Sequence, residues 1–91
     1  MFSGTGVFHQ GLMIALVVDG VLYLKVDDAS RTAFVERGLG PFEYTRLGRR
    51  VQLGSFHQAP EEVLEDADAA AAWARRAYEA ALRAKSKKPA R

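Results

Sequence analysis

The chain has 91 residues, of which 48% are hydrophobic and 26% are charged, and its formal net charge is +2. This length is typical of a single folded domain and is too short for a catalytic domain joined to a regulatory one. The absence of cysteine excludes a disulfide scaffold, a thiolate nucleophile and a cysteine-ligated metal site. The chain also shows neither a signal-peptide pattern nor the roughly 20-residue apolar run that crosses a bilayer, so we expect a cytoplasmic protein with no membrane partner.

The positive charge is concentrated at the C-terminus. The last nine residues hold five Lys or Arg and no acid, whereas residues 1–82 hold 8 Lys or Arg against 11 Asp or Glu, a net charge of −3. The body is therefore mildly acidic and lacks the whole-domain basic footprint of a DNA-binding protein. We expect residues 1–84 to form one domain and residues 85–91 to form a basic, flexible tail.

The first predicted structure is a meander of three antiparallel strands. Leu12 to Val18 and Val21 to Lys25 flank Asp19-Gly20, a pair typical of a tight hairpin turn. A short strand, Val7 to His9, precedes them. The central strand has seven apolar residues in a row, so we expect both of its faces to be covered. The turn predicts a register that pairs Val18 with Val21, Leu16 with Tyr23 and Ile14 with Lys25.

A short helix is predicted next. Asp27 and Asp28 can cap its N-terminus and favour its dipole, and Gly38 supplies the stop. The helix has little apolar mass, and we expect Phe34 and Val35 to be its bulky buried residues.

Residues 42–56, FEYTRLGRRVQLGSF, are predicted to form a second hairpin with Leu47-Gly48 as its turn. The predicted register pairs Tyr44 with Val51 and Phe42 with Leu53 on a core face, and Glu43 with Gln52 and Thr45 with Arg50 on a wet face. Three guanidinium groups, those of Arg46, Arg49 and Arg50, are thereby concentrated at the hairpin tip.

The C-terminal part is predicted to be helical. Ala59-Pro60-Glu61-Glu62 indicates a short helical turn to Leu64, and a long helix is expected from Ala67 to Ala84. The apolar side of the long helix follows three- and four-residue steps and is rich in alanine, which lets its backbone lie close to a sheet. We expect its anchors to be Trp73, Tyr78 and Leu82.

Residues with reactive chemistry are few. His9 and His57 have no third ligand at a metal-binding spacing, and we interpret both as surface residues at strand ends. The serines lie outside any nucleophile-elbow pattern, and Gly4-Thr5-Gly6 lacks the helix and the lysine of a phosphate loop. We therefore expect no catalytic residue, no metal, no cofactor and no enzymatic activity.

Two basic groups are candidate binding sites. The tip residues Arg46, Arg49 and Arg50 can dock on phosphate or on an acidic protein surface, although charged hairpin tips also protect sheet edges from pairing. The C-terminal basic residues can add non-specific phosphate affinity or can simply be a solvated helix end. These residues are Arg83, Lys85, Lys87, Lys88 and Arg91.

The order of the pieces resembles a known family. The chain reads MFSGTGVFHQGLMIALVVDGVLYLKVDD, then a short helix, then GLGPFEYTRLGRRVQL and APEEVLEDADAAAAWARRAYEAA. Its Met-Phe-x-Gly, Gly-Leu-Met, Leu-Tyr-Leu-Lys, Pro-Phe-x-Tyr and Trp-Ala-Arg-Arg segments resemble the N-terminal domain family of TfoX/Sxy, the bacterial regulators of natural competence. The resemblance covers about Met1 to Leu82.

The resemblance implies an α+β fold similar to that of type III secretion chaperones, with helices packed on a five-stranded antiparallel sheet. Relatives carry a further helix before the Met-Phe segment, and full-length regulators also carry a C-terminal helical domain; we expect both to be absent from this chain. An apolar sheet face that lacks this first helix would be left bare, so we expect a homodimer.

The function implied is a non-enzymatic regulatory module that contacts a protein partner. The resemblance places that partner in the transcription machinery, where the competence regulators act with a cyclic-AMP receptor protein. The arginine tip and the open sheet face are the predicted surfaces. The alternative is direct, non-specific nucleic-acid binding through the arginine tip and the basic tail.

Overall fold

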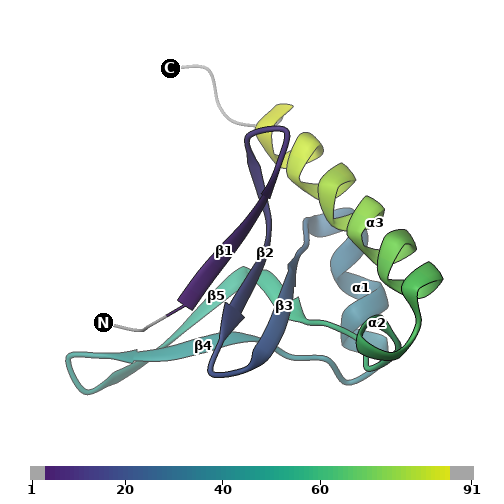
Figure 1. Ribbon diagram of the computed structural model, residues 1–91. Helices are drawn as coiled ribbons and strands as arrows, with labels where there is room; N and C mark the ends of the chain where they lie inside the picture. The colour runs from purple at the N-terminus through teal and green to yellow at the C-terminus, as the bar shows by residue number, and fades with distance from the viewer. Residues whose placement is uncertain (1–3, 87–91) are drawn as a thin grey trace.

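The structure is a computed structural model that describes residues 4–86. It is an α+β fold with one five-stranded antiparallel sheet of order β1-β2-β3-β5-β4, which confirms the predicted class and element order (Figure 1). The elements are β1 (Gly4–His9), β2 (Leu12–Val18), β3 (Val21–Lys25), α1 (Asp28–Glu36), β4 (Pro41–Arg46), β5 (Arg49–Gln58), α2 (Glu62–Glu65) and α3 (Ala67–Ser86).

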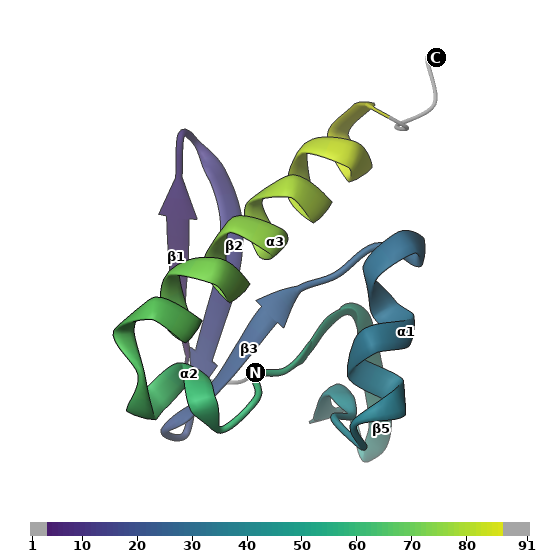
Figure 2. The same ribbon diagram turned by 90° about the vertical axis from the view of Figure 1, so that its right-hand side faces the viewer.

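The helices lie together on one side of the sheet. Helix α3 runs across β2 and β3, and α1 packs beside α3 and against β5 (Figure 2). The β4–β5 hairpin projects away from the helices on the far side of the molecule (Figure 1). Within residues 4–86, no helix is both long and apolar enough to span a membrane.

The predicted hairpin registers are confirmed except near Ile14. Leu16 pairs with Tyr23 as predicted, but the β2–β3 ladder ends at Ala15 and Leu24, so the expected pair of Ile14 with Lys25 is wrong. The reason is a bulge. On the other side of β2, Val7 pairs with Ala15 and Phe8 with Met13, which leaves Ile14 as an extra residue. A bulge turns two consecutive side chains towards one face, and Ile14 and Ala15 both join the core beneath α3.

The central strand is covered on both faces, as its apolar run predicts. One face contributes to the core under the helices, and the other contributes Leu16 and Val18 to a second core with Phe42 and Phe56. Leu16 is only 5% exposed. The second cover therefore comes from the aromatic residues of β4 and β5 in the same chain, and the bare sheet face expected from the sequence is largely closed.

A break in β5 allows this second cover. The first part of β5 pairs with β4, and its last three residues, 56–58, pair with β3. The register with β4 shifts between two neighbouring residues, because Phe42 pairs with Leu53 whereas Pro41 pairs with His57. The residues between them carry no β4 partner, so the strand bends. The bend brings the β4–β5 hairpin over the helix-free face of the sheet.

Helix α1 begins with a capping box. The Asp27 carboxylate accepts a hydrogen bond from the Ser30 backbone N–H, and the Asp27 N–H donates to the Ser30 hydroxyl, both at 3.0 Å. Phe34 is buried as predicted, but Val35 is 58% exposed, so its predicted burial is wrong. Adjacent helical positions differ by about 100° around the axis, and the face of this short helix that contacts α3 and β5 has room for only one of the two.

We expect Val35→Lys to change the free energy of unfolding by less than about 0.5 kcal/mol, because substitutions at exposed positions without special contacts have small effects. Urea titration followed by circular dichroism measures this change. A loss of more than about 1 kcal/mol would show that Val35 packs against the body after all.

Helix α3 extends two residues beyond the predicted Ala84, to Ser86. Trp73 is buried as predicted, but Leu82 is 40% exposed, so its predicted role as an anchor is wrong; Ala80, for which no role was predicted, is completely buried. Because α1 packs beside α3, the buried side of α3 is wider than contact with the sheet alone requires. Ala80 lies on the side of the helix that carries Arg76 and Arg83, which line a groove with α1.

Candidate interaction surfaces

The structure brings the three predicted tip arginines together. Arg46 and Arg49 are directly paired across the end of the β4–β5 ladder, and Arg50 pairs with Thr45 one step further in. All three side chains are exposed. Arg50 lies 3.7 Å from the Glu43 carboxylate, and because its side chain is 77% exposed this contact is a weak, solvent-screened ion pair. The tip therefore presents concentrated positive charge on a two-stranded arm.

An apolar residue stands at the centre of this charge. Leu47 and Gly48 form the turn with φ of 53° and 77°, the left-handed values of a type I′ hairpin turn. The Leu47 side chain is 90% exposed. We call Arg46, Leu47, Arg49 and Arg50 the arginine tip.

The described members of the predicted C-terminal basic group, Arg83 and Lys85, lie near the end of α3 and away from the arginine tip. The Arg83 guanidinium binds the Asp27 carboxylate through Nε at 2.6 Å and through a second nitrogen at 3.1 Å. Lys85 is exposed in the last turn of α3, whereas Lys87, Lys88 and Arg91 lie outside the described residues. Figure 1 shows the end of α3 and the arginine tip at opposite ends of the molecule.

The bond with Arg83 has an electrostatic consequence for Asp27. The hydrogen bond from Arg83, aided by those from Ser30, holds the pKa of the Asp27 carboxyl far below its ordinary value of 3.8, although burial acts in the opposite direction. Asp27 therefore stays ionised and joins the start of α1 to the end of α3. No sequence pattern indicated this pair, because its members lie 56 residues apart.

A second polar network joins all three helices. The Glu62 carboxylate of α2 accepts a hydrogen bond from Arg37 at 2.6 Å and one from Trp73 Nε1–H at 3.1 Å. The Arg37 hydrogen bond, followed by that from Trp73, lowers the pKa of Glu62. The Trp73 ring also has the Arg76 guanidinium over its face, 4.7 Å from the ring centroid. These contacts are structural and explain why Trp73 is core.

The two histidines lie in different environments. His9 is exposed at the end of β1 and stacks edge to face with Tyr78, with ring centroids 4.7 Å apart. His57 is only 3% exposed, so its predicted place on the surface is wrong. Because β5 continues beneath α1 to pair with β3, the His57 ring packs near Phe34, and its Nδ1 lies 2.8 Å from the Leu39 carbonyl oxygen. Residues 4–86 contain no group of three potential metal ligands.

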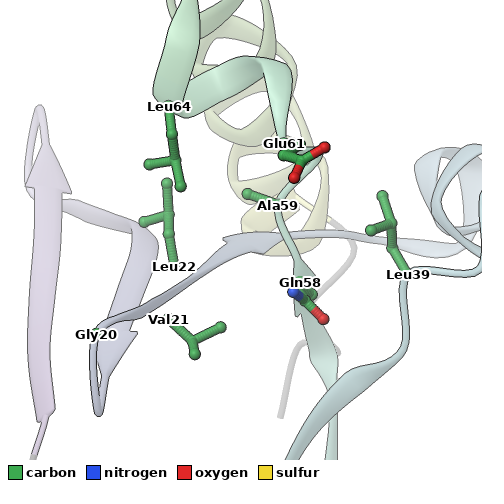
Figure 3. A pocket seen from close by; sticks show the side chains of 8 residues that line it. All are labelled: Gly20, Val21, Leu22, Leu39, Gln58, Ala59, Glu61 and Leu64. Carbon is green, nitrogen blue, oxygen red and sulfur yellow. The ribbon is translucent and has the colours of Figure 1, made fainter.

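A pocket of about 400 Å³ lies between the β2–β3 turn and α2. Figure 3 shows Leu22 and Leu64 close together on one side of it, Leu39 on the other, and Glu61 at its rim. Leu64 is 73% exposed. The sequence did not indicate this pocket, because it forms where four separate segments meet. Its lining residues are Gly20, Val21, Leu22, Leu39, Gln58, Ala59, Glu61 and Leu64.

Comparison with known families decides the assignment. A family model described as the TfoX N-terminal domain matches residues 1–81. The chain belongs to the TfoX N-terminal domain family. No curated protein matches it.

The TfoX N-terminal domain match includes the arginine tip and the pocket and ends before Arg83. The segments that carried the resemblance have structural positions: Leu-Tyr-Leu-Lys is the body of β3, Pro-Phe-x-Tyr begins β4, and Trp-Ala-Arg-Arg lies in α3. Each of these segments supplies core side chains, namely Leu24, Phe42 and Trp73. The segments that resemble the family therefore indicate the fold of this TfoX N-terminal domain. The role of its surface residues has to be inferred from their own chemistry.

Proposed function

We propose that this TfoX N-terminal domain is a non-enzymatic regulatory module that works by contacting a protein partner through the arginine tip. The observation that supports the proposal is the tip itself, where three exposed guanidinium groups surround an exposed leucine on an arm that projects from the body. Arginine forms paired hydrogen bonds with carboxylates, and a central apolar residue with a charged rim is the usual anatomy of a protein contact.

The family suggests the kind of partner. Competence regulators of the TfoX type act at promoters with a cyclic-AMP receptor protein, so we place the partner in the cytoplasmic transcription machinery. A partner that carries carboxylates around an apolar depression would match the tip. Electrostatic complementarity of this kind mainly raises the association rate and the specificity.

Direct binding of nucleic acid is the second candidate, and the basic residues favour it less. Arg83 is held by Asp27, and the arginine tip lies far from the end of α3, so within residues 4–86 the two groups do not form one continuous basic surface. The body also carries a net negative charge over residues 1–82. The net charge of the body therefore does not favour binding of a phosphate backbone.

The test is a binding titration with purified cyclic-AMP receptor protein, RNA polymerase and duplex DNA. The triple variant Arg46→Ala/Arg49→Ala/Arg50→Ala is expected to bind the protein partner at least about tenfold more weakly, because three charge contacts are lost together. The matched control Arg75→Ala/Lys85→Ala removes two exposed cations of α3 and should bind like wild type.

Two results would contradict the proposal. Equal binding of the triple variant and wild type to both proteins would exclude the tip as the contact surface. If wild type bound duplex DNA and neither protein, and if the triple variant and the control both bound DNA more weakly, the nucleic-acid alternative would be established instead. The affinity for DNA should then fall steeply with salt.

A further inference from the structure

The residue in the third hairpin turn is unusual for its position. Within residues 4–86, the three hairpins of the sheet each turn on a residue with φ of 53° or 54° followed by glycine, and the residues at the first position are Gln10, Asp19 and Leu47. Polar residues are favoured there because they tolerate the left-handed conformation and face water. Leu47 is neither polar nor suited to that conformation, and its side chain is 90% exposed.

Folding therefore gives no reason for a leucine at this turn. The side chain lies almost entirely in water, and its backbone conformation is unfavourable for a residue with a bulky Cβ substituent. A backbone outlier that carries an exposed apolar side chain points to a contact made outside the domain. The arginines around it indicate that the matching surface is apolar at its centre and acidic at its rim.

The pocket beside α2 has these properties. Its apolar lining comes from Val21, Leu22, Leu39 and Leu64, and Glu61 stands at its rim (Figure 3). Exposed acids close in sequence to lining residues add negative charge: Asp19 precedes Gly20, and Glu65 and Asp66 are the first and second residues after Leu64. Glu62 adds nothing to this charge because Arg37 neutralises it.

We propose that the Leu47 side chain of one copy inserts into this pocket of a second copy, while the tip arginines face the acids at its rim. A tip cannot reach the pocket of its own chain, because its arm projects away from α2 within one folded body (Figure 1). Two reciprocal contacts related by a twofold axis close the assembly into a dimer. The inference rests on the proposed function, in which the arginine tip is the contact surface, and it identifies the pocket of a second copy as a surface that the tip binds.

The expected association is weak and depends on salt. One side chain with a charged rim buries less surface than a stable interface requires, so we expect dimers at about 100 µM and mostly monomers at about 1 µM. Sedimentation velocity at rising concentration should show the average mass increase at low salt and increase less at high salt, because screening weakens the charged rim.

The variant Leu47→Gln removes the apolar side chain that would insert into the pocket and keeps the turn, since Gln10 occupies the same position of another turn in this chain. We expect Leu47→Gln to remain folded and to self-associate at least about tenfold more weakly.

Exchanging the charges of the tip and of the pocket rim tests the electrostatic part of the contact. The variants Arg49→Glu/Arg50→Glu and Glu61→Arg/Glu65→Arg should each fail to self-associate, and a mixture of the two should form mixed dimers.

The absence of native cysteine allows a direct test of geometry. Thr45→Cys places a thiol beside the tip, and Gln58→Cys places one in the pocket lining, both at exposed positions that carry no charge. A mixture of these two variants should form a disulfide-linked dimer under mild oxidation. The matched control replaces Gln58→Cys by Thr32→Cys on the exposed side of α1, and it should cross-link far less.

The outcomes separate this inference from the proposed function. A wild-type mass that does not change with concentration, or equal cross-linking of Thr45→Cys to the pocket and to the control position, would overturn the self-association. If Leu47→Gln left the self-association unchanged, the inserted leucine would also be overturned. In either case, weaker binding of the arginine-tip triple variant to the regulatory proteins would leave the proposed function intact.

Discussion

Replacing Asp27 with alanine is expected to lower the free energy of unfolding by about 2–3 kcal/mol. The carboxylate is 7% exposed and has two roles, because it caps α1 through Ser30 and binds Arg83 of α3. Loss of the cap alone costs about 1 kcal/mol. The remainder comes from the lost contact with Arg83, and this cost is moderate because the Arg83 side chain is 41% exposed and its guanidinium can bind water instead.

Asp27→Asn is the matched variant that separates the two contributions. Asparagine caps a helix about as well as aspartate does, so this variant should lose only the charge contact and cost about 1–2 kcal/mol. Arg83→Ala should also lower the free energy of unfolding, and the double variant Asp27→Asn/Arg83→Ala should cost little more than Asp27→Asn alone. Additive losses would show that Asp27 and Arg83 do not interact in solution.

The same pair predicts a dependence on pH. Because folding lowers the pKa of Asp27, its contribution to stability is complete above the unfolded pKa, near 3.8, and is lost as the pH falls below that value. The difference in stability between wild type and Asp27→Asn should therefore be constant near neutral pH and shrink below about pH 4. Urea titrations at several pH values measure it, and a constant difference down to about pH 2 would contradict the assignment.

Asp27 also shows where prediction from the sequence ends. Its cap is a local feature, as are the Asp-Gly and Leu-Gly turns and the two-residue alternation of β4, and all of these could be predicted. The partner of Asp27 comes from the other end of the chain, so no spacing reveals it. The extra residue at Ile14 and the burial of His57 depend likewise on how β1 and α1 pack, which a single strand pattern does not contain.

The features of the candidate interaction surfaces likewise fall into those that local sequence patterns predict and those that they do not. The clustering of Arg46, Arg49 and Arg50 follows from the hairpin register and was predicted correctly. The pocket could not be predicted, because its apolar lining becomes a depression only when α2 folds back over the β2–β3 turn. The exposure of Leu47 was within reach of the sequence, since a leucine at the first position of a type I′ turn already violates two preferences.

Replacing Trp73 with alanine is expected to have the largest effect, lowering the free energy of unfolding by about 3–5 kcal/mol. The ring is 7% exposed and stacks edge to face with Phe34 of α1, with centroids 5.2 Å apart. Its Nε1–H also donates to Glu62 of α2. One side chain of α3 thus contacts the other two helices, so the variant leaves a cavity and also removes one of the hydrogen bonds to Glu62.

Trp73→Phe separates the contribution of the buried ring from that of the hydrogen bond to Glu62. Phenylalanine keeps most of the buried ring but cannot donate to Glu62, whose carboxylate still has Arg37, so the expected loss is about 1–2 kcal/mol. Circular dichroism should follow both variants, because they remove the only tryptophan and with it the fluorescence probe. If Trp73→Ala cost no more than Trp73→Phe, the ring would contribute only its hydrogen bond, and the helices would have to be held on the sheet by the alanine side of α3 alone.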